Sequence, residues 1–397
     1  MTSALRVLHL INDLGKGGAQ RFVSGLCCAL NERPDVEARI GALYPENEYR
    51  EATRTTPIVV LGYEPHSILR RTECPEYRRL LEDFRPQVIH TNLFLAEFLS
   101  AQHVQADAVY VCHGHDNMWQ FEPLSGWDLL RREKLLPRYE VLLLRARKYA
   151  RTRTYFVANS QHTAEYYRRT LPRAMQRDVR LIPYGFEFQR FFRELPRASA
   201  QGGPLRLVNV ASFQKKKNQG FLLDVAEALD RRGVAFELHL LGDGETRAQL
   251  EAATRERGLA SRVCFHGNVD GVEQWLWRSD VYVHAAVYEP FGLVFLEAMA
   301  AGLPIVSMDG KGNRDIVRSG VNGFLMQTPD PVLFAEKLLQ IWRSPDLAAQ
   351  LADNGQRQAR DFDMRPRADA FVDFYRSILA ADHRGPLARS LARMRGR

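Results

Sequence analysis

The sequence predicts an α/β protein of two doubly wound, Rossmann-like domains that face each other across a cleft. Short runs rich in β-branched and aromatic residues alternate with longer helix-like segments, which is typical of parallel sheets covered on both faces. The alternation occurs twice, and an irregular stretch separates the two series. The length of 397 residues agrees with two domains, because a domain averages about 150 residues.

The expected strands follow in order along the chain. The first series covers residues 6–11, 37–43, 57–61, 87–90, 108–112, 155–158 and 179–182, and the second covers 205–210, 237–241, 263–265, 281–284 and 305–307. Between them, Arg193–Pro204 has the glycine, proline and serine content of a linker. We expect a first domain at 1–192, a second at 205–364, a helix at 365–382 with apolar residues at helical spacing, and a basic tail at 383–397.

The composition is that of a folded globular protein, with 45% hydrophobic and 26% charged residues. No apolar run approaches the roughly 18–20 residues that cross a membrane, and residues 1–12 lack the pattern of an export signal. The five cysteines are scattered and form no C-x-x-C pair, which argues against disulfides and against a zinc site. We therefore expect a cytoplasmic protein with reduced thiols.

The net charge of +8 is unevenly distributed. Arg131–Arg180 contains 14 Lys and Arg against 4 Asp and Glu, and residues 383–397 contain five arginines and no acid. Leucines interleave with the cations of Arg131–Arg180, which predicts amphipathic helices suited to an anionic membrane face. We expect this segment and the tail to bind the inner face of the cell membrane, and no nucleic acid to bind. A solvated basic face without a partner is the alternative.

Two glutamates lie in the segment Tyr288–Pro304. Proline and glycine punctuate both ends of an apolar run, which predicts a buried helix of about ten residues. Glu289 would lie on the loop before this helix and Glu297 on its second turn, so both carboxylates would reach one pocket. The alternative is a buried helix that carries one exposed glutamate and follows one loop glutamate.

A glycine pair, Gly17 and Gly18, follows the first strand and opens a helical pattern. Glycines at a helix start let backbone N–H groups approach an anion or a sugar closely. The surrounding residues match neither the phosphate-loop pattern nor the dinucleotide-binding pattern. A tight strand-to-helix turn without a ligand is the alternative.

His113, His115 and Asp116 follow the strand expected at 108–112. Ligands bind beyond the carboxyl ends of strands in α/β folds, so these side chains are candidate ligand contacts. The His-x-His-Asp spacing alone is weak evidence for a metal, and we expect none here. A structural histidine at a strand end is the alternative.

Three lysines, Lys215, Lys216 and Lys217, lie on a loop between the first strand and the first helix of the second domain. Cations at a helix start, where backbone N–H groups also point outward, form a suitable seat for a diphosphate. A solvated lysine run is the alternative.

In order along residues 5–330, these motifs resemble those of the retaining glycosyltransferases of family 4, which have the GT-B fold. The segment with Glu289 and Glu297 resembles the two-glutamate signature of that family, and Lys217 matches the lysine of its Arg-x-x-x-x-Lys element. The arginine of that element is Ser212 here, which leaves open whether Lys215 or Lys216 supplies the missing charge. Further matches lie at 182–187, 241–245, 312–317 and 320–325.

The resemblance implies a role for each candidate residue. Glu289, Lys217 and His113 would be catalytic, with His113 beside the donor sugar, and His115 and Asp116 would contact the acceptor. Glu297 would hold the ribose of the donor. The other implied donor-binding residues are Gly17, Gly18, Ser212, Phe291, Gly292 and Leu293. The helix at 365–382 would pack back on the first, acceptor-binding domain, and the second domain would bind the nucleotide-sugar.

The implied reaction moves a sugar from a nucleotide-diphosphate sugar to a saccharide or lipid-linked acceptor, with retention and without a metal or other cofactor. Lipopolysaccharide, capsule or exopolysaccharide synthesis in a bacterium is the implied setting. Two alternatives compete with this interpretation. A nucleotide-sugar 2-epimerase of the same fold would need no acceptor, and a noncatalytic polyanion-binding protein would explain the arginines but not the two glutamates. The donor sugar, the nucleobase and the acceptor stay open.

Overall fold

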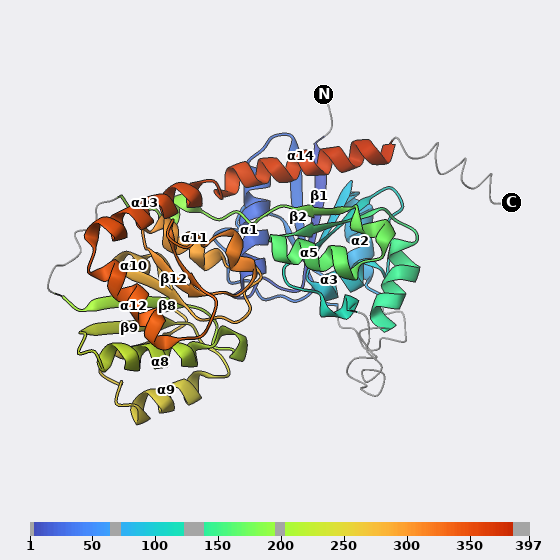
Figure 1. Cartoon of the computed structure of the whole chain (residues 1–397). Helices are drawn as coiled ribbons and strands as arrows, with labels where there is room; N and C mark the ends of the chain where they lie inside the picture. Colours follow the sequence, from blue (N-terminus) through green and yellow to red (C-terminus); the bar gives the residue numbers. More distant parts are fainter. Residues whose placement is uncertain (1–3, 64–72, 123–138, 195–202, 384–397) are drawn as a thin grey trace. The chain divides into compact units, whose positions relative to one another are not determined.

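The computed structural model describes residues 4–63, 73–122, 139–194 and 203–383, which form two compact units (Figure 1). The first unit contains Met1–Gly185 and Met364–Arg397, and the second contains Phe186–Asp363. Each unit has a parallel sheet with helices packed against it. The expectation of two Rossmann-like α/β halves is confirmed.

The sheet of the first unit has seven strands in the order β3-β2-β1-β4-β5-β6-β7, and all neighbouring pairs are parallel. They are β1 (Leu5–Ile11), β2 (Val36–Ala42), β3 (Ile58–Val60), β4 (Val88–Asn92), β5 (Val109–Gly114), β6 (Thr154–Ala158) and β7 (Val179–Leu181). The strand order reverses between β1 and β4. Doubly wound sheets bind ligands in the crevice at such a reversal.

The helices of the first unit include one from the far end of the chain. They are α1 (Gly18–Asn31), α2 (Pro75–Phe84), α3 (Phe94–Ser100), η1 (Trp119–Phe121), the π-helix η3 (Arg145–Tyr149), α5 (Gln161–Thr170), α6 (Arg173–Gln176) and α14 (Met364–His383). Helix α14 packs against α1 and β5. The hydroxyl of Tyr375 on α14 lies 2.6 Å from Nδ1 of His90 on β4, which ties the helix to the sheet.

The sheet of the second unit has six parallel strands in the order β10-β9-β8-β11-β12-β13. They are β8 (Leu205–Val210), β9 (Phe236–Leu241), β10 (Val263–Gly267), β11 (Val281–His284), β12 (Ile305–Met308) and β13 (Gly323–Met326). The helices are α7 (Phe188–Phe191), η4 (Lys215–Lys217), α8 (Gln219–Asp230), α9 (Arg247–Glu256), α10 (Val272–Arg278), α11 (Leu293–Ala300), η5 (Gly312–Asp315), α12 (Pro331–Trp342) and α13 (Pro345–Arg360). The reversal here lies between β8 and β11.

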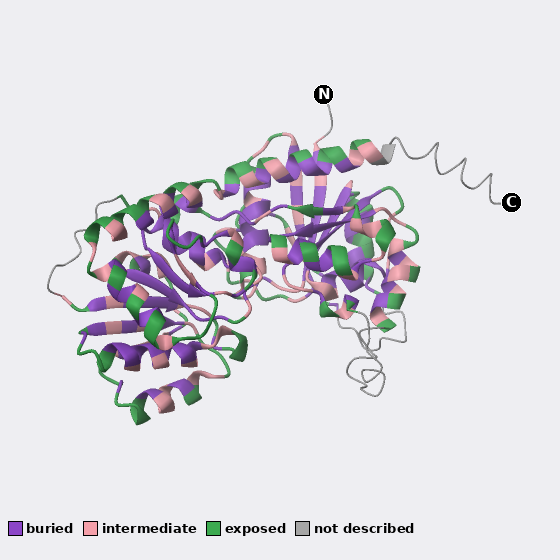
Figure 2. Ribbon diagram, viewed as in Figure 1, coloured by how far each residue is buried: buried purple, intermediate pink, exposed green. Residues whose placement is uncertain are grey.

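Burial follows the layered arrangement of each unit (Figure 2). The central strands β4, β5, β6 and β11 are buried along their whole length, as expected for parallel strands covered on both faces. Helices such as α2 bury one face and expose the other. Among the candidate residues, His113 lies near the carboxyl end of β5 and Glu289 follows β11.

The boundary between the units differs from the sequence expectation. We expected the first domain to run to residue 192, but the units divide after Gly185. Phe186 pairs with Asp363, and its N–H donates to the carbonyl of Phe362 at 3.0 Å. Helix α7 then packs on α11, so Phe188–Phe191 belongs to the second unit. The glycine and proline content of 193–204 marked an irregular stretch but not the true division. The basic tail at 384–397 and part of the linker, 195–202, lie outside the described residues.

All twelve expected strands are present within one or two residues, and one strand was missed. Strand β13 pairs with β12 in register, Ile305 opposite Gly323. Its four residues, Gly-Phe-Leu-Met, include no β-branched side chain and begin with glycine, so the sequence reads as a loop. Pairing with a neighbouring strand, rather than local preference, makes this segment a strand.

The basic segment Arg131–Arg180 is only partly a surface helix. Residues 131–138 lie outside the described part, and β6 within the segment is fully buried. Lys148 on η3 has no exposed surface; its Nζ donates to Oε2 of Glu97 at 2.6 Å and to Oγ of Ser100 at 2.7 Å. One of the counted cations is therefore neutralised inside the first unit. Among the described residues, no helix is both long and apolar enough to span a membrane.

Candidate functional site

The loop that carries Glu289 is fixed by its backbone. It follows β11 and precedes α11, whose N-cap Gly292 has a φ of 91°, a conformation that favours glycine. The N–H of Glu289 donates to the carbonyl of Gly310 at 2.8 Å, and the N–H of Gly312 donates to the carbonyl of Glu289 at 3.0 Å. Two loops are thereby joined as a short ladder beyond the ends of β11 and β12.

Close approach explains the glycines in the second of these loops. A Cβ on Gly312 would lie 1.9 Å from the carbonyl oxygen of Pro290, and one on Gly310 would lie 2.8 Å from the Cβ of Glu289. The side chain of Asn313 completes the loop: its Oδ1 accepts from the N–H of Gly310, and its Nδ2 donates to Oγ of Ser307 and to the carbonyl of Met308. The position of Glu289 thus depends on backbone that no larger residue could occupy.

Lys217, Glu289 and His284 meet at the carboxyl edge of the second sheet. Nζ of Lys217 donates to Oε2 of Glu289 at 2.6 Å, and Nε2 of His284 lies 3.3 Å from the same oxygen. The side chains of Lys217 and Glu289 are 15% and 9% exposed, so solvent screens their attraction little. The sequence analysis placed Lys217 and Glu289 in one site but did not anticipate their direct contact.

The charges of this group follow from its surroundings. Burial alone would raise the pKa of Glu289, but the nearby Lys217 and His284 outweigh burial and lower this pKa from 4.5 to about 2. Burial lowers the pKa of His284, although Glu289 acts in the opposite direction. At neutral pH the group therefore holds a carboxylate, an ammonium and a neutral imidazole.

Glu297 lies on the second turn of α11 and is buried. The predicted helix is confirmed, although it spans eight residues rather than ten. The pKa of the buried Tyr282 hydroxyl is raised well above its ordinary value by burial and by the negative charges of Glu289 and Glu297. The charges of both carboxylates therefore act on one side chain of β11.

A cavity of about 330 Å³ lies beside the lysine loop. Its lining includes Lys215 and Lys216, both exposed, and residues of the turn after β9; the full lining is Gln214, Lys215, Lys216, Gly244 and Glu245. Ser212 is exposed on the same loop, and its carbonyl accepts from Nε2 of Gln219 at 3.0 Å. Two cations therefore border a space in the second unit, while Lys217 points to Glu289.

The side chains at the start of α11 are too buried to contact a ligand. Phe291 is 1% exposed and packs near Phe362, and Leu293 is 7% exposed. A donor bound at this turn would therefore contact its backbone rather than its side chains. Their assignment as donor-binding residues stays a prediction.

In the first unit, Gly17 and Gly18 lie where α1 begins. Gly17 is the N-cap, and its N–H donates to the hydroxyl of Tyr49 at 3.3 Å. Gly18 is exposed, and a Cβ there would meet nothing within 4 Å. Packing within the described residues therefore does not require glycine at 18, which leaves room for a ligand at this turn.

His113 and His115 lie in an aromatic cluster at the carboxyl ends of β4 and β5. The ring of His113 is fully buried, stacks on His115 with centroids 4.3 Å apart, and has its Nδ1 3.2 Å from Nε2 of His90. Nε2 of His113 has no hydrogen-bond partner among the described residues. His115 is 8% exposed; its Nε2 lies 2.9 Å from Oδ1 of Asn92, and its Nδ1 contacts the hydroxyl of Tyr184.

Burial keeps these histidines neutral. It lowers the pKa of His115 from 6.5 to about 3, with a smaller contribution from His9, and lowers the pKa of His113 well below its ordinary value. Asp116 lies beyond them on a half-buried loop, where its Oδ1 accepts from the N–H of Asn117 at 2.6 Å. His115 and Asp116 follow β5, but His113 lies within the strand, which runs to Gly114, and it faces the cluster interior rather than an open surface.

Sequence reasoning missed several participants. His284 ends an expected strand, and its position at the carboxyl edge could have marked it as a candidate. Gly312 and Asn313 lie in the motif at 312–317, for which no role was predicted. No local pattern in the sequence linked them to Glu289. Tyr184 lies in the motif at 182–187, for which no role was predicted, yet its ring stacks on Phe22 with centroids 4.5 Å apart.

Comparison with known proteins identifies the family. The model described as Glycosyltransferase Family 4 matches residues 16–190, and the model described as Glycosyl transferases group 1 matches residues 192–358. The chain belongs to the family 4 glycosyltransferases. The first match covers most of the first unit except residues 1–15 and the segment that contains α14, and the second covers nearly all of the second unit.

Several relatives of this family 4 glycosyltransferase take part in polysaccharide synthesis by name. LpsE of Rhizobium meliloti, a lipopolysaccharide core biosynthesis glycosyltransferase, is 35% identical over 44% of this chain and 49% of its own. AmsK of Erwinia amylovora, an amylovoran biosynthesis glycosyltransferase, is 28% identical over 41% of this chain and 42% of its own. EpsF of Bacillus subtilis is 26% identical over 78% of this chain and 80% of its own. The chain thus matches about half the length of LpsE and AmsK.

Solved structures share the fold of this family 4 glycosyltransferase. HepE of Anabaena, solved with UDP and glucose, has a TM-score of 0.74 and 21% identity, covering 94% of this chain and 100% of HepE. WaaG, a glycosyltransferase involved in lipopolysaccharide biosynthesis, has a TM-score of 0.69 and 18% identity, covering 93% and 99%. At these identities the likeness shows the GT-B fold alone.

Proposed function

We propose that this glycosyltransferase moves a sugar from a nucleotide-diphosphate sugar to a saccharide or lipid-linked acceptor, with retention, in lipopolysaccharide, capsule or exopolysaccharide synthesis. The observation that carries the proposal is the ion pair between Lys217 and Glu289, whose lysine shares the turn η4 with Lys215 and Lys216. A nucleotide-sugar 2-epimerase would not need an acceptor, and a polyanion-binding protein would not need a buried carboxylate. The names of the relatives favour transfer over both.

The charges of the second unit fit departure of a nucleotide diphosphate. Negative charge builds on the leaving phosphate as the bond to the sugar breaks, and fixed cations in a poorly hydrated site stabilise such charge strongly. Lys217 would contact this charge together with Lys215 or Lys216, both of which border the cavity. In this proposal the protein's cations, rather than a metal ion, supply the stabilisation.

The two glutamates would bind different parts of the donor. Glu289, ionised and anchored by its backbone, would orient the sugar hydroxyls and offset positive charge that develops near the ring. Glu297, one turn into α11, would accept hydrogen bonds from the ribose. The start of α11 would approach the donor through backbone N–H groups.

The first unit would supply the acceptor side. His115 and Asp116 would contact the acceptor, and His113 would contribute the unpaired Nε2 to the sugar. Because that nitrogen is buried in the cluster, His113 has the least direct support of the proposed catalytic residues. A role in positioning His115, on which its ring stacks, agrees better with its surroundings.

Ligand-dependent thermal unfolding tests the donor proposal first. We expect one nucleotide diphosphate among UDP, GDP and ADP, or its sugar conjugate, to raise the free energy of unfolding by about 2.7 kcal/mol at 100 times its dissociation constant. The Lys217→Ala variant should lose most of this effect, whereas Lys337→Ala, at a surface lysine of α12, should keep it. Absence of stabilisation by every nucleotide and conjugate in folded wild-type protein would contradict the proposal.

We propose further that the protein binds the inner face of the cell membrane through the described part of Arg131–Arg180. Helices α5 and α6 contact each other. The exposed cations on and around these helices are Arg151, Arg168, Arg169, Arg173, Arg177 and Arg180. The exposed Leu142 and Leu181 accompany them, 51% and 40% exposed. Cations beside apolar side chains suit a surface of anionic lipids, and each cation near such a surface contributes about 1 kcal/mol.

Liposome flotation tests the membrane proposal. We expect binding to vesicles that contain anionic lipid, weakening as salt is added, and little binding to neutral vesicles. Reversal of Arg168, Arg169 and Arg173 to glutamate should abolish flotation. Reversal of three exposed arginines of the second unit, Arg231, Arg255 and Arg278, serves as the control of equal charge change. Flotation that ignores lipid charge would count against the proposal.

A further inference from the structure

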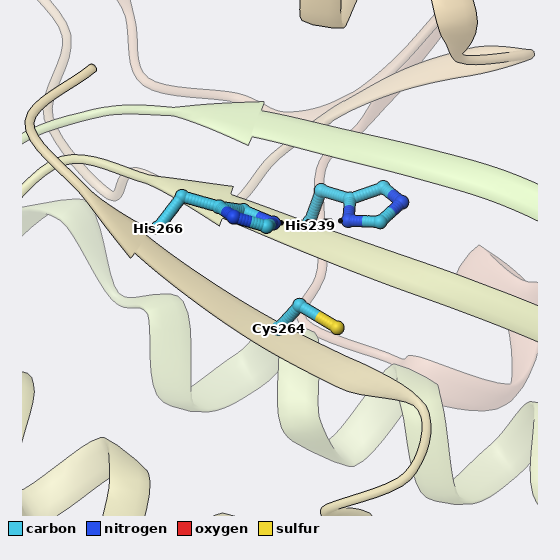
Figure 3. A group of neighbouring side chains, drawn as sticks. All are labelled: His239, Cys264 and His266. Atoms are coloured by element: carbon cyan, nitrogen blue, oxygen red, sulfur yellow. Dashed lines mark hydrogen bonds between the residues drawn. The ribbon is translucent and has the colours of Figure 1, made fainter.

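Three potential metal ligands lie together at one edge of the second sheet (Figure 3). His239 comes from β9, and Cys264 and His266 come from the edge strand β10. Each offers one ligand atom, and these atoms all lie within 4.8 Å of one another. No other such group of three or more His, Cys, Asp or Glu occurs among the residues that the structure describes.

The strand register explains why the three side chains share a face. Cys264 pairs with His239 across the parallel strands, so their side chains project from the same side of the sheet. His266 follows Cys264 by two residues, and alternate residues of a strand point to the same face. The register shifts between Phe265 and Gly267, which places His266 at an irregularity in the edge strand. Sequence spacing hides this arrangement, because Cys264 lies 25 positions after His239 in the chain.

The spacing of the ligand atoms suits a tetrahedral ion. Nδ1 of His239 lies 3.1 Å from Nε2 of His266. Zinc–nitrogen bonds of about 2.0–2.1 Å and zinc–sulfur bonds of about 2.3 Å place tetrahedral ligand atoms about 3.3–3.6 Å apart. The two imidazole nitrogens are therefore almost at that separation already. Sγ of Cys264 lies within 4.8 Å of a ring nitrogen of each histidine.

Neighbouring side chains hold the two rings in place. Oε2 of Glu237, two residues before His239 on β9, lies 3.4 Å from Nε2 of His239, the ring nitrogen that faces away from His266. Histidines that bind metals commonly present their second ring nitrogen to a carboxylate, which fixes the tautomer and frees the other nitrogen for the ion. The ring of Trp275 packs on His266 with centroids 4.0 Å apart. The three ligands are half-buried, so an ion can reach them from solvent.

We propose that His239, Cys264 and His266 bind one Zn²⁺, with Glu237 orienting His239 and water in the fourth position. A thiolate with two imidazoles selects zinc over magnesium or calcium, which prefer oxygen ligands. The ion would join the edge strand β10 to β9 just before Gly242 and Gly267, whose backbones are linked by a 2.7 Å hydrogen bond. The ion would stabilise the pairing of these two strands and take no part in sugar transfer. The scattered cysteines argued against a zinc site, but folding brings one of them beside two histidines.

Metal binding by the untagged full-length protein tests this proposal. We expect chelator-treated wild-type protein to take up one Zn²⁺ per chain, measured by elemental analysis and by competition with a chromophoric chelator. Glu237→Gln should weaken zinc binding about 10- to 100-fold, and Cys264→Ser should weaken it more. Cys28→Ser, at a half-buried cysteine of the first unit, is the matched control and should bind zinc as the wild type does.

Cobalt substitution provides a readout that does not depend on any variant folding. Co²⁺ bound to wild-type protein should show the thiolate-to-cobalt charge-transfer band and the intense visible bands of a tetrahedral site. Zinc should abolish both by displacement. Wild-type protein that binds Zn²⁺ no more tightly than Cys264→Ser, or a cobalt complex without a thiolate band, would overturn the proposal. The His239–His266 contact would then be an ordinary hydrogen bond between two imidazoles.

Discussion

Replacing Lys217 with alanine is expected to lower the rate of sugar transfer by about 10²- to 10³-fold, the usual effect of removing one donor that stabilises charge in a transition state. The substitution removes the ammonium that lies 2.6 Å from Glu289, on the same turn as Lys215 and Lys216. Because this charge matters most when the phosphate departs, kcat should fall more than KM rises. Initial rates with saturating donor and acceptor measure the effect.

Two further variants separate chemistry from stability. Removing Lys217 leaves the carboxylate of Glu289 buried with only His284 nearby, so the single variant should also unfold at a lower temperature. Adding Glu289→Gln to Lys217→Ala removes that isolated charge and should restore part of the stability without restoring transfer. Lys337→Ala should change neither property. Nearly full turnover by a folded Lys217→Ala protein would show that the lysine has no part in the reaction.

Replacing Lys148 with alanine is expected to destabilise the first unit by about 3–5 kcal/mol, because it leaves the buried carboxylate of Glu97 without its cation. Neither side chain has any exposed surface. The carboxylate also accepts from the Tyr149 hydroxyl at 2.8 Å, which cannot compensate for the lost charge. Urea unfolding followed by a probe in the first unit measures the change.

The controls for this variant come from the same segment. Arg151→Ala removes an exposed cation three residues later and should alter the free energy of unfolding by less than about 0.5 kcal/mol. Replacing both partners, Glu97→Leu with Lys148→Met, should recover part of the loss, since no isolated charge is then buried. A change below about 1 kcal/mol for Lys148→Ala would mean that water reaches Glu97 in the variant.

The sheets were predictable because their signal is local. Buried parallel strands are short apolar runs, and twelve of them could be located from residue type alone. Strand β13 was missed because its hydrogen-bonding partner, not its composition, makes it a strand. The boundary at Gly185 was missed for a similar reason: Phe186 pairs with a residue 177 positions later in the chain.

The candidate site was predictable in its parts but not in its contacts. Family resemblance indicated Lys217 and Glu289 separately, but their ion pair joins residues 72 positions apart. His284 and Asn313 have no motif of their own and matter only through their geometry. Lys148 looked like one cation in a basic run, and only packing reveals that it is neutralised inside the protein. The contacts within this site thus depend on pairings between distant segments, which a single sequence does not encode locally.

The glycine-dependent ladder that holds Glu289 has a consequence for engineering. Its anchors are backbone atoms of Gly310 and Gly312, whereas the cavity beside it is lined by the side chains of Gln214, Lys215, Lys216 and Glu245. Those four side chains do not form the hydrogen bonds of the ladder, so libraries that vary them can search for new donor preferences while the carboxylate stays in place. Substitution of either glycine would instead disrupt the ladder, so both should be kept in such libraries.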